Sequence, residues 1–211
     1  KILAGTVNPS GRLTDTYAYN VGSNPASVNF GDFNYTNIDK LSFMNYSEGI
    51  YVGYRFYETY YQDDEAGYQA TVQFPFGYGL SYTDFAWEVV NHTMTADEIS
   101  LEVKVTNTGN TAGKDVLQVY FSAPYTPSGI EKSAIELGGY GKTSLLDPSA
   151  SENIKISFPT RDMSSYDMDD TEAYVLEKGT YEIMLSKNVH EPVTTLSYEV
   201  PETVVYKEDD A

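Results

Sequence analysis

Residues 99–110, Ile-Ser-Leu-Glu-Val-Lys-Val-Thr-Asn-Thr-Gly-Asn, contain the pattern that decides the fold of this chain. In residues 99–106, apolar side chains occupy every second position and polar side chains lie between them. Because side chains alternate between the two faces of a β-strand, this spacing predicts a strand with one buried face. Residues 107–110 are a turn-forming sequence. The stretch therefore predicts a strand of an antiparallel sheet, ending in a turn.

Similar short strands, each followed by turn residues, continue on both sides of this stretch. They are expected at residues 85–90, 116–122, 134–140, 153–158, 172–177, 180–186 and 194–200. About seven or eight such strands predict an antiparallel β-sandwich of the immunoglobulin or fibronectin type III class over residues 85–201. The acidic residues 202–211 are expected to form a tail or linker with a frayed end.

Residues 1–84 differ from the rest, with turn formers and aromatic residues but little regular periodicity. In residues 50–57, Ile-Tyr-Val-Gly-Tyr-Arg-Phe-Tyr, alternation predicts one strand with both faces partly covered. Glycine and proline recur at close intervals in residues 74–82, so an ordered loop is expected there. No stretch before residue 85 has the pattern of a capped helix, so no helix is expected in this part of the chain.

The composition excludes several classes of function. The 211 residues carry 31 acidic and 13 basic side chains, a net charge of -18, so no nucleic-acid partner is expected. The absence of cysteine excludes disulfides, thiolate metal sites and a cysteine nucleophile. It does not fix the compartment, and we expect a bacterial protein that is either cytoplasmic or secreted. No apolar run approaches the ~18 residues of a membrane helix, so no span is expected. The 20 tyrosines suit both half-buried strands and sugar-facing surfaces.

Motifs for a catalytic or metal site are scarce. The two histidines, His92 and His190, lie far apart and lack partners at metal-ligand spacing. Residues 167–170, Asp-Met-Asp-Asp, lack the glycine and distal glutamate of an EF-hand loop. Neither a Gly-x-Ser-x-Gly nucleophile elbow nor a phosphate-binding glycine loop occurs. We therefore expect no metal and no cofactor. Glycoside hydrolysis needs two carboxylates across a sugar, and the sequence alone does not place any two acids in that way.

Three motifs in the first 85 residues resemble, in order, the signatures of glycoside hydrolase family 3, the β-glucosidase and β-xylosidase group. They are Asn-Pro-Ser-Gly-Arg-Leu at 8–13, Tyr-Ser-Glu-Gly-Ile-Tyr-Val-Gly-Tyr-Arg-Phe-Tyr at 46–57, and Phe-Pro-Phe-Gly-Tyr-Gly-Leu-Ser-Tyr-Thr-Asp-Phe at 74–85. Further stretches resemble the fibronectin type III-like domain of that family, at 103–109, 112–116, 118–120, 136–140 and 163–167. Together the motifs cover nearly the whole chain.

The resemblance implies a division of the chain into three parts. Residues 1–84 would be the C-terminal segment of the family's α/β sandwich domain, residues 85–201 its fibronectin type III-like domain, and residues 202–211 an acidic tail or linker. The fold would be mainly β, with the β-sandwich preceded by an incomplete segment of an α/β sandwich domain.

The resemblance also implies where the chemistry lies. In this family the nucleophile is an aspartate of a (β/α)8 barrel, and the acid/base glutamate lies earlier in the α/β sandwich domain. Neither motif occurs in this chain, so we expect no catalytic residue here and no activity of the chain alone. The parent would be a retaining β-glucosidase acting on terminal non-reducing β-D-glucosyl residues. Its barrel would lie before Lys1 or after Ala211, and the rest of the enzyme would be the partner of this chain.

Some side chains in these motifs have both a structural and a substrate-binding interpretation. Arg12 is expected to bind a neighbouring carboxylate rather than substrate. Glu48 and Arg55 are expected to form an ion pair, with each other or with another domain, while a sugar contact stays open. Four tyrosines either line a sugar site or pack against parts of the enzyme outside this chain: Tyr54, Tyr57, Tyr60 and Tyr61. The glycines of residues 74–82 are expected to permit unusual backbone angles at a packed domain junction.

A second hypothesis, from a different class, is a non-catalytic carbohydrate-binding or adhesion module built on a β-sandwich. The tyrosine content and the acidity motivate it. Such a module would bind glucans as an isolated chain. An enzyme fragment, in contrast, requires residues 1–84 to be incomplete and to expose apolar aromatic surface.

Overall fold

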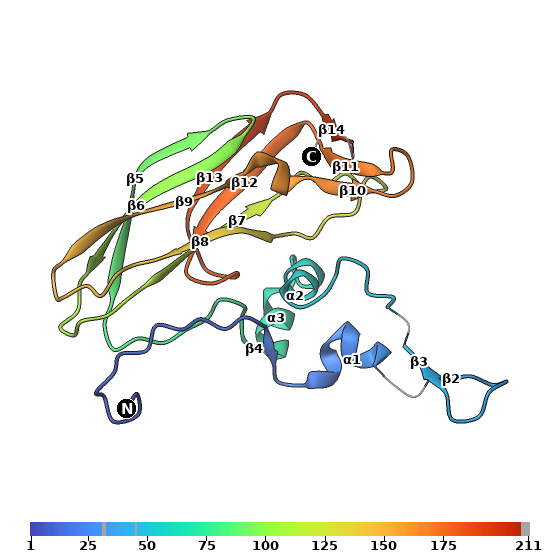
Figure 1. The fold of residues 1–211 in the computed structure, drawn as a ribbon, viewed down its shortest axis with the longest axis horizontal. Helices are drawn as coiled ribbons and strands as arrows, with labels where there is room; N and C mark the ends of the chain where they lie inside the picture. Colours follow the sequence, from blue (N-terminus) through green and yellow to red (C-terminus); the bar gives the residue numbers. More distant parts are fainter. Residues whose placement is uncertain (31–32, 45, 208–211) are drawn as a thin grey trace.

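A computed structural model describes residues 1–30, 33–44 and 46–207. These residues form a β-sandwich and an N-terminal segment, residues 1–84, that lies against one face of the sandwich (Figure 1). The segment contains β1 (Tyr17–Ala18), a 3-10 turn (Val21–Ser23), α1 (Pro25–Asn29), β2 (Phe33–Asn34), β3 (Ser42–Phe43), α2 (Tyr54–Tyr60), α3 (Glu65–Thr71) and β4 (Val72–Phe74). None of the helices in these ranges has the length and apolarity needed to cross a membrane.

The sandwich consists of two antiparallel sheets. Its strands are β5 (Phe85–Met94), β6 (Glu98–Asn107), β7 (Val116–Ser122), β8 (Glu136–Lys142), β9 (Ser151–Pro159), β12 (Gly179–Ser186) and β13 (Pro192–Val200). One sheet has the order β5-β6-β9 and the other the order β13-β12-β7-β8. Each of these strands coincides with a stretch in which alternation predicted a strand, and the predicted fold class is confirmed.

The core lies between the two sheets and is built from the apolar positions of the alternating stretches. On β6, Leu101, Val103 and Val105 are almost completely buried, while Lys104 between them is exposed. They pack against the inward side chains of β7 and β12, among them Val119 and Ile183, in one continuous apolar cluster. Burying one such side chain stabilises the fold by about 1.5–3 kcal/mol relative to leaving it exposed, so the alternation determines which face turns inward.

A small third sheet beside the sandwich has the order β10-β11-β14, with β10 at Ser165–Asp167, β11 at Ala173–Leu176 and β14 at Val204–Tyr206. A 3-10 turn, Thr160–Met163, leads into it from β9. The expectation of a frayed tail was wrong for β14, because this strand pairs in register with β11. The guanidinium of Arg161 also lies 5.0 Å from the centre of the Tyr206 ring. The rest of that expectation, residues 208–211, falls outside the described residues.

The prediction of a strand at residues 50–57 was wrong, because a helix, α2, begins at Tyr54. Gly53 has φ 56°, a conformation that ends extended backbone and that glycine adopts without strain. From there the inward side chains follow the helical spacing of 54, 57, 58 and 61, and Tyr57 and Glu58 are buried. Four of the seven residues of α2 are aromatic, so the apolar positions fit a period of two as well as the helical period.

The expectation that residues 1–84 hold no capped helix was also wrong. The Asp64 carboxylate accepts a hydrogen bond from the Gly67 N–H at 2.9 Å and caps α3. The Asn24 side chain caps α1, which has Pro25 in its first turn.

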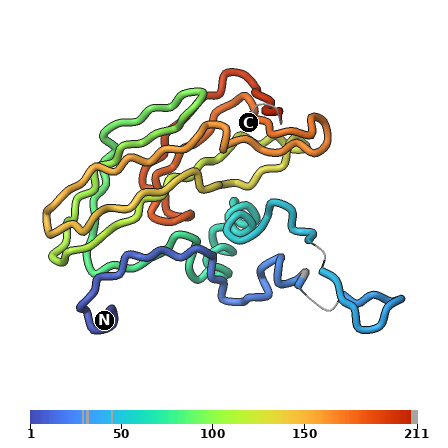
Figure 2. Tube along the Cα trace, viewed as in Figure 1, coloured from blue at the N-terminus to red at the C-terminus, as the bar shows by residue number. Residues whose placement is uncertain are grey.

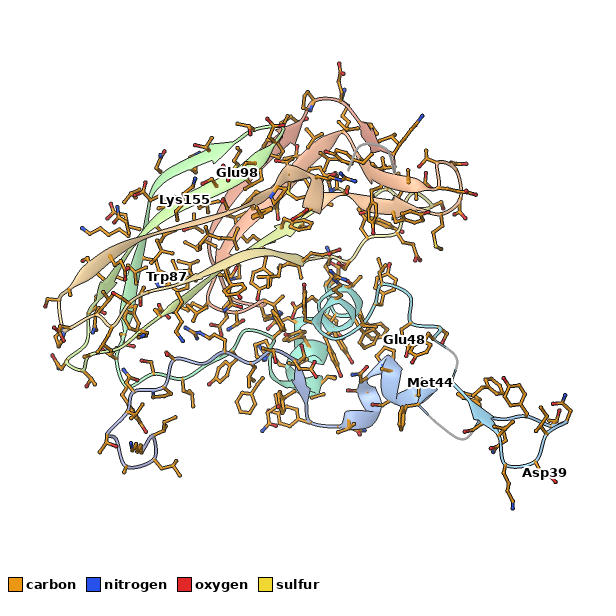
Figure 3. All side chains as sticks on the ribbon, in the orientation of Figure 1. Asp39, Met44, Glu48, Trp87, Glu98 and Lys155 are labelled. Atoms are coloured by element: carbon orange, nitrogen blue, oxygen red, sulfur yellow. The ribbon has the colours of Figure 1, made fainter. Side chains whose placement is uncertain are left out.

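The segment buries little of its own apolar surface. Its own cluster contains only Tyr57, Tyr68 and Val72 as buried members. Of the exposed large apolar side chains in the described chain, two thirds precede residue 85. The β2–β3 hairpin projects away from the sandwich, and Figure 3 places Asp39 at its far end. Figure 2 shows the chain running beneath one face of the sandwich before it enters β5.

Candidate functional site: the junction between segment and sandwich

The N-terminal segment covers the outer face of the four-stranded sheet around β7, and we call this contact the junction. Six of the seven residues of β7 are buried, so this strand is covered on both faces. Its side chains Leu117, Val119 and Phe121 enter the core, whereas Gln118 and Tyr120 face the segment. A strand covered on its core face alone would leave Gln118 and Tyr120 exposed to solvent. Their burial shows that the segment belongs to the folded unit around β7.

The first polar contact of the junction is an ion pair between Arg12 and Asp115. Arg12 Nη2 donates to Asp115 Oδ1 at 2.6 Å, and the Asp115 side chain is 6% exposed. Trp87 Nε1 donates to the other carboxylate oxygen at 2.7 Å. The expectation that Arg12 binds a neighbouring carboxylate is therefore confirmed. The carboxylate of Asp115, just before β7, therefore links residues 8–13, through Arg12, to β5, through Trp87.

The second contact centres on the buried amide of Gln118. Its Nε2 donates to the backbone oxygens of Gly77 at 3.1 Å and Lys187 at 2.8 Å, while its Oε1 accepts from the Tyr120 hydroxyl at 2.7 Å. The Tyr120 ring lies edge-on to Tyr54 of α2. Burial is the main cause that raises the pKa of the Tyr120 phenol, so it stays a donor. The amide therefore joins three parts of the chain: β7, the β12–β13 turn, and the loop of residues 75–84, which we call the glycine loop.

The glycine loop also holds the N-terminal motif directly. Leu13 N–H donates to Tyr78 O, and Gly77 N–H donates to Leu13 O, both at 2.8 Å. Gly79 lies so close to the backbone of residues 8–13 that an added Cβ would be 2.5 Å from the carbonyl oxygen of Gly11. Residues 8–13 and 74–82 thus form the two sides of one backbone contact. The ordered loop expected at residues 74–82 is confirmed for 75–82, while Phe74 belongs to strand β4.

A third contact links α2 to β8. Arg55 Nη2 donates to Glu136 Oε2 at 2.6 Å, and the Leu137 N–H donates to the Tyr54 hydroxyl at 3.0 Å. This confirms the alternative in which Arg55 pairs across the junction, and Glu48 takes no part in that pair. Glu48 is half-buried and lies on the segment (Figure 3).

We predict that the Arg55–Glu136 pair contributes about 0.5–1 kcal/mol of coupling energy, because both side chains are partly exposed, at 37% and 27%. A double-mutant cycle of Arg55→Met, Glu136→Gln and the double variant, followed by urea unfolding, measures this energy. A coupling energy of zero would show that the pair does not help to hold α2 on the sandwich.

The fourth contact is made by His190, in the turn between β12 and β13. Its Nδ1 lies 2.8 Å from Glu58 Oε2 of α2, and its Nε2 lies 3.0 Å from Glu65 Oε2 of α3. The imidazole stacks on the Tyr68 ring with 3.7 Å between centroids and an angle of 5°. Burial is the main cause that raises the pKa of the Tyr68 phenol, whose hydroxyl donates to Glu58. His190 was not expected to form a site because it has no partners at metal-ligand spacing in the sequence. The two acids that it contacts are 132 and 125 residues away along the chain.

The remaining candidates lie apart from these four contacts. His92 is exposed on β5. Asp167 accepts hydrogen bonds from the backbone N–H groups of three following residues, Asp170 foremost, which lower the pKa of its carboxyl group. This acidic loop therefore satisfies its own first carboxylate. Among the described residues, no group of three or more potential ligands is placed to hold a metal ion.

Of the four tyrosines considered for a sugar site, Tyr54 and Tyr57 are packed within the junction and the segment core. Tyr60 is 68% exposed and stacks on Phe56. The Tyr61 hydroxyl accepts a hydrogen bond from Thr71 at 2.9 Å. Tyr54 thus packs at the junction and Tyr57 is buried, while Tyr60 and Tyr61 contact each other with ring centroids 4.8 Å apart. The four side chains therefore do not present one common surface to a sugar.

Comparison with known proteins assigns this arrangement to a family. Residues 115–189 match the fibronectin type III-like domain family. Beta-glucosidase A of Butyrivibrio fibrisolvens is 36% identical over 99% of this chain, and a beta-glucosidase of Ruminococcus albus is 34% identical over 99%. The crystal structure of a beta-glucosidase from Paenibacillus barengoltzii superimposes on 97% of this chain with a TM-score of 0.82 and 36% identity. The chain belongs to glycoside hydrolase family 3.

The family 3 chain spans only part of these relatives. It covers 26% of the Butyrivibrio protein, 20% of the Ruminococcus protein and 22% of the Paenibacillus structure. The matches extend over the N-terminal segment as well as the sandwich, because they include nearly all of the chain. The junction is therefore part of the shared structure, and the resemblance inferred from the three motifs is confirmed.

Proposed function

We propose that this chain is the C-terminal scaffold portion of a family 3 retaining β-glucosidase that hydrolyses terminal non-reducing β-D-glucosyl residues. The observation that carries the proposal is the unfinished N-terminal segment. It buries three large apolar side chains of its own, while two thirds of the exposed ones in the described chain belong to it. A surface of this kind is normally covered by another part of the same protein or by a partner.

We further propose that the boundary between the two parts lies at residues 84 and 85. The apolar cluster between the sheets uses only residues from 85 onward, and the loop that precedes β5 ends at Asp84. Residues 85–201 then form the fibronectin type III-like domain. In this proposal its role is to hold residues 1–84 in place through the junction, so that the rest of the enzyme has a fixed surface to pack on.

The surroundings of the buried carboxylates support placing the catalytic acids outside this chain. Glu58, Asp115 and Asp167 are the buried carboxylates among the described residues. Each is bound by several donors of the protein itself, from His190 and Tyr68, from Arg12 and Trp87, and from the loop after Asp167. Retaining hydrolysis needs one carboxylate free to attack and one free to exchange a proton. Carboxylates committed in this way are structural.

The whole polypeptide that contains this chain is expected to release p-nitrophenol from p-nitrophenyl β-D-glucopyranoside. The isolated 211-residue chain, assayed at the same molar concentration, is expected to release none. The p-nitrophenyl α-D-glucopyranoside serves as the stereochemical control. Absence of release from every aryl β-glycoside by the whole polypeptide would contradict the proposal, as would turnover by the isolated chain.

Isothermal titration of the isolated chain with β-linked gluco-oligosaccharides tests the alternative role of a carbohydrate-binding module. We expect no heat of binding, because Tyr54 and Tyr57 are packed in apolar clusters and Tyr60 is the one of the four candidate tyrosines that is largely exposed. A saturable heat would favour the binding module over the scaffold.

A further inference from the structure

The turn that carries His190 is fixed to the N-terminal segment by its backbone. Lys187 N–H donates to Glu191 O and closes the turn, and Val189 N–H donates to Phe76 O of the segment, both at 3.0 Å. The imidazole is therefore held over Tyr68, between α2 and α3. A group at this position contacts both helices and the sandwich at once.

The hydrogen-bond pattern determines the protonation state of this imidazole. Each ring nitrogen faces a carboxylate oxygen, at 2.8 Å from Glu58 and 3.0 Å from Glu65. The other oxygen of Glu58 accepts from the Tyr68 hydroxyl, and that of Glu65 accepts from Gln69 Nε2 at 2.7 Å. A neutral imidazole has one N–H and would turn a lone pair toward one of the two acids. Only the imidazolium donates to both.

The surrounding charges are acidic. Two hollows adjoin the ring, one of about 660 Å³ and one of about 220 Å³. Their charged lining residues are Glu58 on α2, Glu65 on α3, Glu182 on β12, Glu191 on the turn, and His190 itself. Tyr68 on α3 also faces the ring. The proton on His190 is therefore the positive charge that these acids share across the junction.

We propose that His190 is a proton-dependent clamp between the sandwich and helices α2 and α3. When protonated, it binds one carboxylate on each helix. When it loses the proton, one hydrogen bond is lost and acids from both sides of the junction face one another. The helices then separate from the β12–β13 turn while the sandwich core, which lies on the other side of the sheet, stays folded.

The direction of the pH dependence follows from the pKa shifts. The hydrogen bond to Glu58 is the main cause that raises the pKa of His190 above 6.5. A raised pKa in the docked state means that the clamp is fully effective below about 6.5 and weakens as the pH rises through the docked value. At the acid end, the hydrogen bond from Gln69 and then that from His190 lower the pKa of Glu65 below 4.5. The contribution of Glu65 is present above 4.5 and is lost as the pH falls through its lowered value.

The test uses the 211-residue chain, which has only two histidines. Imidazole C–H resonances recorded from pH 5 to 9 are expected to show His190 titrating above 6.5, with its signals shifted upfield by the stacked Tyr68 ring. Hydrogen exchange of peptides covering α2 and α3 is expected to accelerate, by up to about tenfold per pH unit beyond the intrinsic change, between 6.5 and that midpoint. Peptides from β6 are expected to show no such extra acceleration.

His190→Gln is expected to abolish the extra acceleration in α2 and α3, and His92→Gln, the matched control on β5, is expected to retain it. Glu58→Gln is expected to lower the midpoint of His190. The fluorescence of Trp87, the single tryptophan, reports whether the sandwich of each variant stays folded. A midpoint of His190 at or below 6.5 would overturn the proposal. So would an exchange profile of α2 and α3 that is the same in wild type and His190→Gln.

Discussion

Replacing Asp115 with alanine is expected to lower the free energy of unfolding by about 3–5 kcal/mol, because it leaves Arg12 and the Trp87 N–H without their shared acceptor in a largely buried place. The Asp115 side chain is 6% exposed and the Arg12 side chain 23%. Each hydrogen bond to a charged group contributes about 1.5–3 kcal/mol, and this carboxylate accepts one from the guanidinium and one from the indole.

Urea unfolding followed by the Trp87 fluorescence measures this loss. Asp147→Ala is the matched control, because Asp147 is an exposed aspartate of the same sandwich, and it is expected to change stability by less than about 0.5 kcal/mol. Arg12→Met in the Asp115→Ala background removes the unpaired charge and is expected to restore part of the loss. Equal stability of the Asp115→Ala and Asp147→Ala variants would show that the ion pair does not hold the junction.

The sandwich could be predicted from the sequence because its evidence is local. On β6, Leu101, Val103 and Val105 point inward by their spacing alone, and the same rule located the other strands of both sheets. The tail was assigned wrongly because the pairing of β14 with β11 depends on residues about 30 positions apart, and nothing in its own sequence indicates that partner.

The helices of the segment were missed for a different reason. In Tyr54–Tyr60, apolar residues are so frequent that a period of two and a period of 3.6 fit equally well. The signal that separates them is Gly53, whose φ of 56° ends the extended backbone. For α3, the Asp64-Glu65-Ala66-Gly67 sequence is a helix start in which Asp64 is the cap, but an acidic cluster is also typical of a solvated loop.

The junction could be predicted only in part. The arginine of motif 8–13 was expected to bind a carboxylate, and the structure identifies that carboxylate as Asp115. Which carboxylate it would be depends on the fold, since the two residues are 103 positions apart. His190 gave no signal, because its two acids come from helices that the sequence did not predict. Gln118 gave only a weak signal in the sequence. It is a polar residue in the strand Val116–Ser122, and both faces of that strand are buried in the structure.

Gly77→Ala is expected to cost about 3 kcal/mol, since two separate penalties meet at this residue. Its φ is +81°, which an L-residue with a Cβ adopts only under strain. An added Cβ would also overlap the Gln118 side-chain amide. That amide does not have room to withdraw, because it is bound to Gly77 O, Lys187 O and the Tyr120 hydroxyl.

Gly49→Ala separates the two penalties. Gly49 has φ +60° and no heavy atom within 4 Å of a built Cβ, so its substitution introduces the backbone strain alone, about 1 kcal/mol. Urea unfolding of both variants gives the difference that belongs to the packing of the glycine loop on Gln118. If the two substitutions cost the same, the loop moves away from β7 without penalty. The close fit of Gly77 on Gln118 would then contribute nothing to the stability of the junction.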